Sequence, residues 1–74
     1  MTNAYIDVGE RLSKLTGVQV FVAPGYDYSN HESVYNLTIN KKIFRVDMQP
    51  WDQIDDVYWY LKKHIENEIP EVML

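Results

Sequence analysis

The 74-residue sequence contains no cysteine, which excludes disulfides, zinc–thiolate sites, iron–sulfur clusters and thiol catalysis. With three glycines in all, the chain has no glycine-rich loop of the kind that cradles phosphates. Its longest apolar run, Val18–Ala23, is interrupted by Gln19 and is too short to cross a bilayer. The first residues lack the basic and hydrophobic regions of a secretory signal, so we expect a cytoplasmic protein.

Positive charge is also scarce, since seven Lys and Arg stand against eleven Asp and Glu for a net charge of −4. This balance opposes broad electrostatic capture of nucleic acid or of an anionic membrane. The share of hydrophobic residues, 46%, is typical of a globular protein. We expect one small domain over residues 1–74. Because the core of so short a chain is small, a homodimer would add useful buried surface.

Apolar residues at helical spacing predict two helices. The first runs from about Asn3 to Leu15, with Gly17 placed as a C-cap. The second begins near Pro50, a favourable first helical residue, and ends before Pro70. The predicted apolar stripes comprise Tyr5, Val8, Leu12 and Leu15 in the first helix and Trp51, Ile54, Val57, Tyr58, Leu61, Ile65 and Ile69 in the second.

Three strands are predicted between the helices, at Val18–Ala23, Ser33–Ile39 and Ile43–Met48. The last two form a hairpin closed by a two-residue type I′ turn at Asn40-Lys41. This register pairs Leu37 with Phe44 and Tyr35 with Val46. It gathers on one face Tyr35, Leu37, Ile39, Phe44, Val46 and Met48.

The predicted fold class is therefore α+β: a helix, a three-stranded antiparallel sheet and a helix (αβββα), with both helices on one face of the sheet. This order resembles the topology of double-stranded-RNA-binding domains. Those domains carry a basic stripe at the start of their last helix, where this chain has Asp52, Asp55 and Asp56. We therefore expect no direct nucleic-acid binding.

Few residues suit catalysis or metal binding. His31 lies near Asp27 and Glu32, and His64 precedes Glu68 by one helical turn, so each group could serve as an acid–base pair or as metal ligands. Neither matches a known metal-ligand spacing. We expect a protein that is not an enzyme and that needs no cofactor and no metal.

Trp59 is the first candidate for a partner-binding residue, because helical geometry places it opposite the apolar stripe, among charged residues. An exposed tryptophan is a favoured interface anchor. The alternative is a local cation–π contact with Lys62 or Lys63. Two further aromatic candidates, Tyr26 and Tyr28, lie in the long connection Pro24–Glu32.

The acidic residues Asp52, Asp55 and Asp56, together with Asp47, form the densest charge cluster. Acids at a helix start are favoured by the helix dipole alone. A second interpretation is a phosphate-mimicking surface that blocks the basic groove of a nucleic-acid-binding protein.

The face of the sheet away from the helices is a candidate for self-association, through an apolar patch of Phe21, Val34 and Ile43. We expect a small acidic protein-binding module, which in size and composition resembles accessory or inhibitor proteins of bacteriophages and prophages. The alternatives are a structural homodimer joined through this sheet face and the nucleic-acid mimic.

Overall fold

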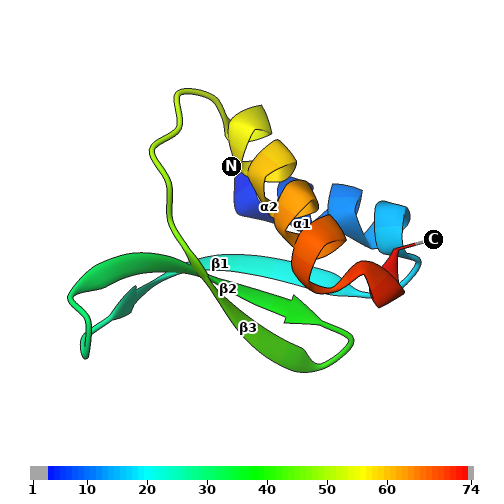
Figure 1. Ribbon diagram of the computed structural model, residues 1–74. Coiled ribbons are helices and arrows are strands. Elements are labelled where there is room, and N and C mark those ends of the chain that lie inside the picture. Colours follow the sequence, from blue (N-terminus) through cyan, green and yellow to red (C-terminus); the bar gives the residue numbers. More distant parts are fainter. Residues whose placement is uncertain (1–3, 74) are drawn as a thin grey trace.

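The computed structural model describes residues 4–73. The elements follow the order α1 (Ala4–Thr16), β1 (Val20–Asp27), β2 (Glu32–Ile39), β3 (Lys42–Asp47), α2 (Ile54–Glu68) and the short 3-10 helix η1 (Pro70–Val72). The strands form one antiparallel sheet in the order β1-β2-β3. Both helices lie on the same side of this sheet (Figure 1), so the predicted αβββα fold is confirmed. The predicted start of the first helix, Asn3, lies outside the described residues.

The hairpin between β2 and β3 has the predicted register. Leu37 pairs with Phe44 and Tyr35 pairs with Val46. Asn40 and Lys41 have φ angles of 50° and 73°, the positive values that a type I′ turn requires at both central positions. The turn therefore sets which residues of the two strands face the helices.

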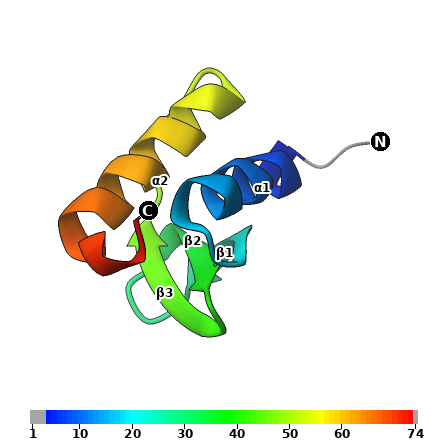
Figure 2. The same cartoon turned by 90° about the vertical axis from the view of Figure 1, so that its right-hand side faces the viewer.

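The core lies between the sheet and the two helices, which run side by side (Figure 2). Tyr35 is at its centre and is almost fully buried, with the rings of Tyr5 and Tyr60 at 6.1 and 6.4 Å. Burial raises the pKa of the Tyr35 phenol above its ordinary value, and the nearby Tyr5 and Tyr60 add to this effect. The other buried members of the cluster are Val8, Leu12, Val20, Val22, Leu37, Ile39, Val46, Val57, Leu61, Ile65 and Ile69.

Helix α2 begins four residues later than predicted. Its first residue is Ile54, and the carboxylate of Asp56 accepts the backbone N–H groups of Gln53 at 3.2 Å and of Asp52 at 3.3 Å. These bonds satisfy donors that would otherwise be unpaired at the helix start. Trp51 therefore belongs to the connection after β3 rather than to the helical stripe, and it is 39% exposed.

The predicted long connection Pro24–Glu32 is mostly strand. β1 continues to Asp27 and β2 begins at Glu32, which leaves a four-residue turn over residues 28–31. The carboxylate of Asp27 accepts the N–H groups of Ser29 and Asn30 at 3.0 and 3.2 Å and closes the turn. The sequence pattern missed this extension because Pro24 and Gly25 normally signal the end of a strand.

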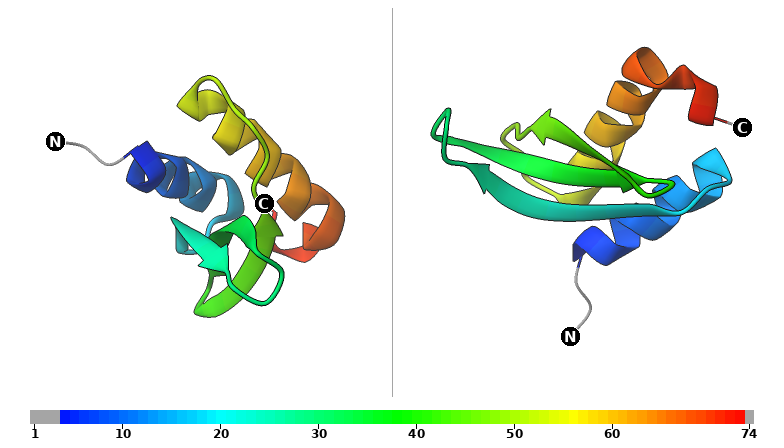
Figure 3. Two further views of the ribbon diagram at one scale, coloured as in Figure 1. Left: turned by 90° about the vertical axis from the view of Figure 1, so that its left-hand side faces the viewer. Right: turned by 90° about the horizontal axis from the view of Figure 1, so that it is seen from below.

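Helix α1 lies along the outer edge of β1 (Figure 3). The hydroxyl oxygen of Ser13 accepts the N–H of Val20 at 2.9 Å, so a helix side chain takes the place of a neighbouring strand there. Gly9 permits this close approach, because a Cβ atom at position 9 would lie 2.9 Å from the carbonyl oxygen of Val20. The interior glycine of α1 is therefore required by packing against β1.

We predict that Gly9→Ala destabilises the fold, although alanine is the better helix former by about 1 kcal/mol. The added methyl group meets backbone of β1, which a side-chain rotation cannot relieve, and overpacking of this kind costs about 1–3 kcal/mol. Urea unfolding measures the change, with the exposed neighbour substitution Glu10→Ala as the control. Stabilisation by Gly9→Ala would contradict the close packing of α1 on β1.

Candidate functional site

The sheet face that points away from the helices carries two different halves. Phe21 pairs with Thr38, which pairs in turn with Ile43. The three residues form one row across the sheet, with a large apolar side chain at each end. Phe21 is 57% exposed and Ile43 is 73% exposed. We call Phe21, Thr38 and Ile43 the apolar row. Large hydrophobic side chains exposed in one row of an uncovered face are typical of a binding surface.

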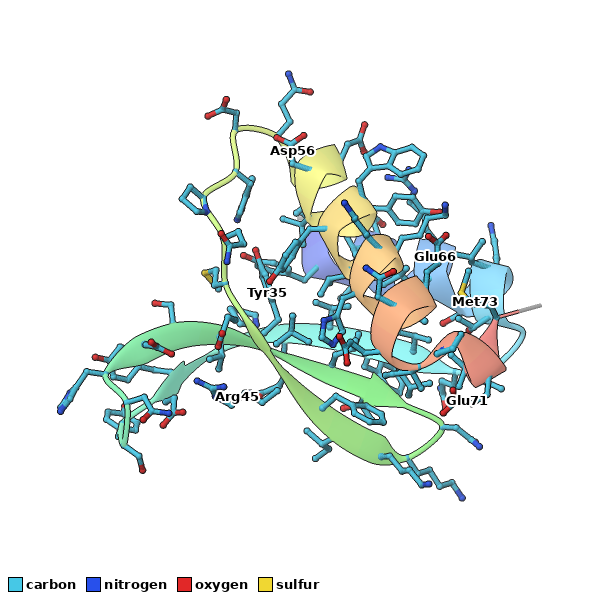
Figure 4. All side chains as sticks on the ribbon, viewed as in Figure 1. Tyr35, Arg45, Asp56, Glu66, Glu71 and Met73 are labelled. Carbon is cyan, nitrogen blue, oxygen red and sulfur yellow. The ribbon has the colours of Figure 1, made fainter. Side chains whose placement is uncertain are left out.

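The other half of this face is an ionic cluster centred on Arg45 of β3. Its guanidinium reaches Asp27 at 2.8 Å, Glu32 at 3.0 Å and Asp47 at 3.2 Å, so it contacts one carboxylate at the end of each strand. Figure 4 shows Arg45 on the side of the sheet opposite the helices. We call these four residues the Arg45 cluster. It joins the ends of the three strands where no helix covers them.

Val34 does not belong to the exposed patch that the sequence predicts. It is only 3% exposed and lies two rows away from Phe21 and Ile43. The register places Val34 between Gly25 and Asp47, beneath the path that the Arg45 side chain takes to its carboxylates. The patch of three predicted residues is therefore a patch of two, because a long charged side chain covers the third.

Asp27 connects the Arg45 cluster to the turn over residues 28–31. The backbone N–H of Asn30 is the largest influence that holds the pKa of the Asp27 carboxyl below its ordinary value. Partial burial opposes this shift, whereas the Asn30 side chain, the Ser29 N–H and the charge of Arg45 add to it. The carboxylate form of Asp27 is therefore part of the folded structure at neutral pH.

Trp59 lies on the opposite side of the molecule from the Arg45 cluster, on the outer surface of α2, and is 57% exposed. Its ring meets Tyr58 edge-on at 5.2 Å, and the ammonium of Lys62 lies 5.2 Å from its centre. The predicted alternative of a local cation–π contact is therefore present. Lys62 also pairs with Glu66 at 2.9 Å, so Trp59 and the cation beside it both have partners within the chain.

The predicted acidic surface is divided among separate partners. Asp55 pairs with Arg11 of α1 at 2.7 Å, and that guanidinium stacks on the ring of Tyr58 at 3.9 Å. Asp56 accepts the N–H groups at the start of α2, and Asp47 belongs to the Arg45 cluster. Three of the four carboxylates thus have structural partners and do not form one free acidic patch.

The two loop tyrosines lie at the far tip of the β1–β2 hairpin. Tyr28 is the more exposed and contacts Tyr26 edge-on, with ring centres 4.9 Å apart. Neither ring belongs to the hydrophobic core or packs against it. Both tyrosines are therefore accessible, yet they lie at the opposite end of β1 from Phe21.

The histidine clusters do not assemble. Asp27 and Glu32, the acids near His31, both bind Arg45 instead. Within residues 4–73, no three His, Asp or Glu side chains are arranged to hold a metal ion.

A groove of about 540 Å³ runs beneath the connection that follows β3, and its walls are formed by Glu32, Ser33, Asp47, Met48, Gln49, Pro50 and Trp51.

No protein-family model, no curated protein and no solved structure matches this chain. Neither helix within the described residues is long and apolar enough to span a membrane. Among the candidate surfaces of residues 4–73, the apolar row is the one whose exposed side chains have the fewest contacts within the fold.

We predict that the fold loses stability in acid partly through Asp27. Because its pKa is lowered in the folded chain, its contribution is present above the ordinary value of 3.8 and is lost as the pH falls through the lower folded value. Asp27→Asn keeps the side-chain shape and removes this titration. The midpoint temperature of thermal unfolding, measured from neutral pH down to about pH 2, should fall less steeply in the variant than in the wild type. Equal slopes would contradict the role given to Asp27.

Proposed function

We propose that this chain is a protein-binding module without catalytic activity and that its partner docks on the open sheet face at the apolar row. The observation that carries the proposal is the exposure of Phe21 and Ile43 in one row, on either side of Thr38, on a face that no helix covers. Burying two such side chains against a partner provides the apolar centre that protein interfaces need.

The open face is a better docking surface than the outer side of α2. Trp59 already has an aromatic and a cationic neighbour, and that cation, Lys62, also pairs with Glu66. The rings of Phe21 and of Trp59 are equally exposed, but no ring or cation contact involves Phe21 among the described residues. A partner therefore gains more by covering Phe21 than by covering Trp59.

Charge on the open face favours a basic partner surface beside an apolar one. The Arg45 cluster sets three carboxylates against one guanidinium, which leaves it negative overall. The net charge of the chain, −4, has the same sign and would speed association with a basic protein. This supports an accessory or inhibitor role more than nucleic-acid mimicry, because the predicted mimic surface is divided among internal partners.

We predict that Phe21→Ser weakens partner binding about tenfold or more, the loss expected when an anchoring side chain is removed. The partner is first isolated with the tagged wild-type protein from its source cells and identified by mass spectrometry. Its affinity for purified wild type, Phe21→Ser and Trp59→Ser is then measured by calorimetry. Both substitutions remove an exposed ring. Phe21→Ser should change stability by no more than about 0.5 kcal/mol, and Trp59→Ser, which also loses its contacts with Tyr58 and Lys62, by about 1 kcal/mol.

Trp59→Ser is the matched control and should bind like the wild type. The opposite pattern, with binding lost in Trp59→Ser and kept in Phe21→Ser, would move the site to α2 and overturn the proposal. Unfolding midpoints of both variants show whether a loss of binding reflects a loss of fold.

A further inference from the structure

The outer edge of β3 is open. Met48 donates its N–H to the carbonyl of Ser33, so residues 33 and 48 form a hydrogen-bonded pair. Hydrogen-bonded pairs alternate along an antiparallel ladder, which turns the N–H and C=O groups of Ile43, Arg45 and Asp47 away from β2. An unpaired strand edge is a template for another strand.

Part of this edge is already occupied. The hydroxyl of Tyr60 donates to the carbonyl oxygen of Asp47 at 2.6 Å. Within residues 4–73, the outward backbone groups of Ile43 and Arg45 make no hydrogen bond. The free edge therefore has three donors, the N–H groups of Ile43, Arg45 and Asp47, and two acceptors, the carbonyls of Ile43 and Arg45.

The other edge of the sheet is closed to pairing along residues 20–24 of β1. Asn40 donates to the carbonyl of Gln19, and by the same alternation Val20, Val22 and Pro24 face outward. Ser13 binds the N–H of Val20, Gly9 brings α1 against this stretch, and Pro24 has no N–H to donate. The sheet can thus extend on one side only, which favours a closed pair of chains over a fibre.

We propose that a second copy of this chain pairs with the free edge, with the two β3 strands antiparallel about a two-fold axis at Phe44. In this register Ile43 of each copy exchanges both backbone hydrogen bonds with Arg45 of the other. The N–H and C=O groups of Ile43 and Arg45 are all used in both copies, and the bond from Tyr60 to the Asp47 carbonyl is kept. The product is a continuous six-stranded sheet.

Two features select this register and this occupant: charge complementarity, and the bond from Tyr60 that already occupies the Asp47 carbonyl and so disfavours an axis at Val46. With the axis at Phe44, Asp47 of one copy lies opposite Lys41 of the other. An axis at Arg45 would set two Arg45 side chains directly opposite each other, and an axis at Ile43 would set Arg45 opposite Lys41. Like charges directly opposite in a ladder are destabilising, so both neighbouring registers are disfavoured.

The pairing goes beyond the proposed function and does not depend on it. It would place the apolar rows of both copies on one face of the joined sheet, with the two Ile43 side chains on either side of the axis. A partner would then meet two adjoining apolar rows, and a repeated partner would bind more tightly through both.

Two measurements at about 0.15 M salt test the pairing. Sedimentation measures association, and amide hydrogen exchange, followed by NMR at several protein concentrations, shows which amides become protected. As chains associate, exchange at Ile43 and Arg45 should slow together, by about tenfold when nine-tenths of chains are paired. The amides of Phe44 and Val46 face β2 and should be protected at every concentration. Lys41→Glu places an acid opposite Asp47 and should weaken association, whereas Lys63→Glu, the same change of charge on α2, should not.

Three results would overturn the proposal. The first is a monomer at every concentration. The second is a dimer in which Ile43 and Arg45 still exchange fast, which would mean association through another surface. The third is protection of these amides only when a different protein is added, which would make the edge a docking site for a foreign strand. Phe21→Ser should leave self-association intact, so failure of this pairing and failure of the proposed function are distinguishable.

Discussion

One guanidinium organises half of the sheet face that no helix covers. Arg45 contacts a carboxylate from the end of each strand, and its side chain covers Val34, which would otherwise be an exposed apolar residue. Each of these half-exposed bridges contributes on the order of 0–1 kcal/mol. The larger effect is on shape, because the cluster protects half of the open face and leaves the apolar row as the part available to a partner.

Both edges of the sheet depend on the helices in a related way. α1 closes the β1 edge through Ser13 and Gly9, and α2 reaches the β3 edge through Tyr60 at a single carbonyl. The β1 edge is better covered than the β3 edge because α1 packs along β1, whereas α2 touches the β3 edge at one point only. The molecule therefore presents one open face and one open edge, and the two meet at Ile43.

Much of the fold could be predicted from local patterns. Alternation along Tyr35, Leu37 and Ile39, together with the turn at Asn40-Lys41, was enough for the register of the hairpin, because turn type and side-chain period must agree. The start of α2 could not be predicted, because Pro50 is a good first residue, but the helix begins four residues later, at Ile54, where the Asp56 carboxylate caps it. The extension of β1 through Pro24 depends on an edge position that only tertiary structure creates.

The candidate site was predictable in part. Alternation placed Phe21 and Ile43 on the open face, and their exposure follows from it. The burial of Val34 was missed because residues far apart in sequence, Asp27 and Arg45, approach one another over it. A signal existed in the same alternation, since Arg45 shares its face with Asp47 and with the acids at the ends of the β1–β2 hairpin. Reading charges across strands as well as along them would have found the cluster.

The central claim is that the open sheet face, and not the outer side of α2, meets the partner. Photo-crosslinking inside source cells tests it most directly, with a photoreactive phenylalanine analogue placed at position 21 or at position 59. If the partner docks on the open face, position 21 gives a crosslink to another chain and position 59 gives little or none. A crosslink from position 59 without one from position 21 would contradict it.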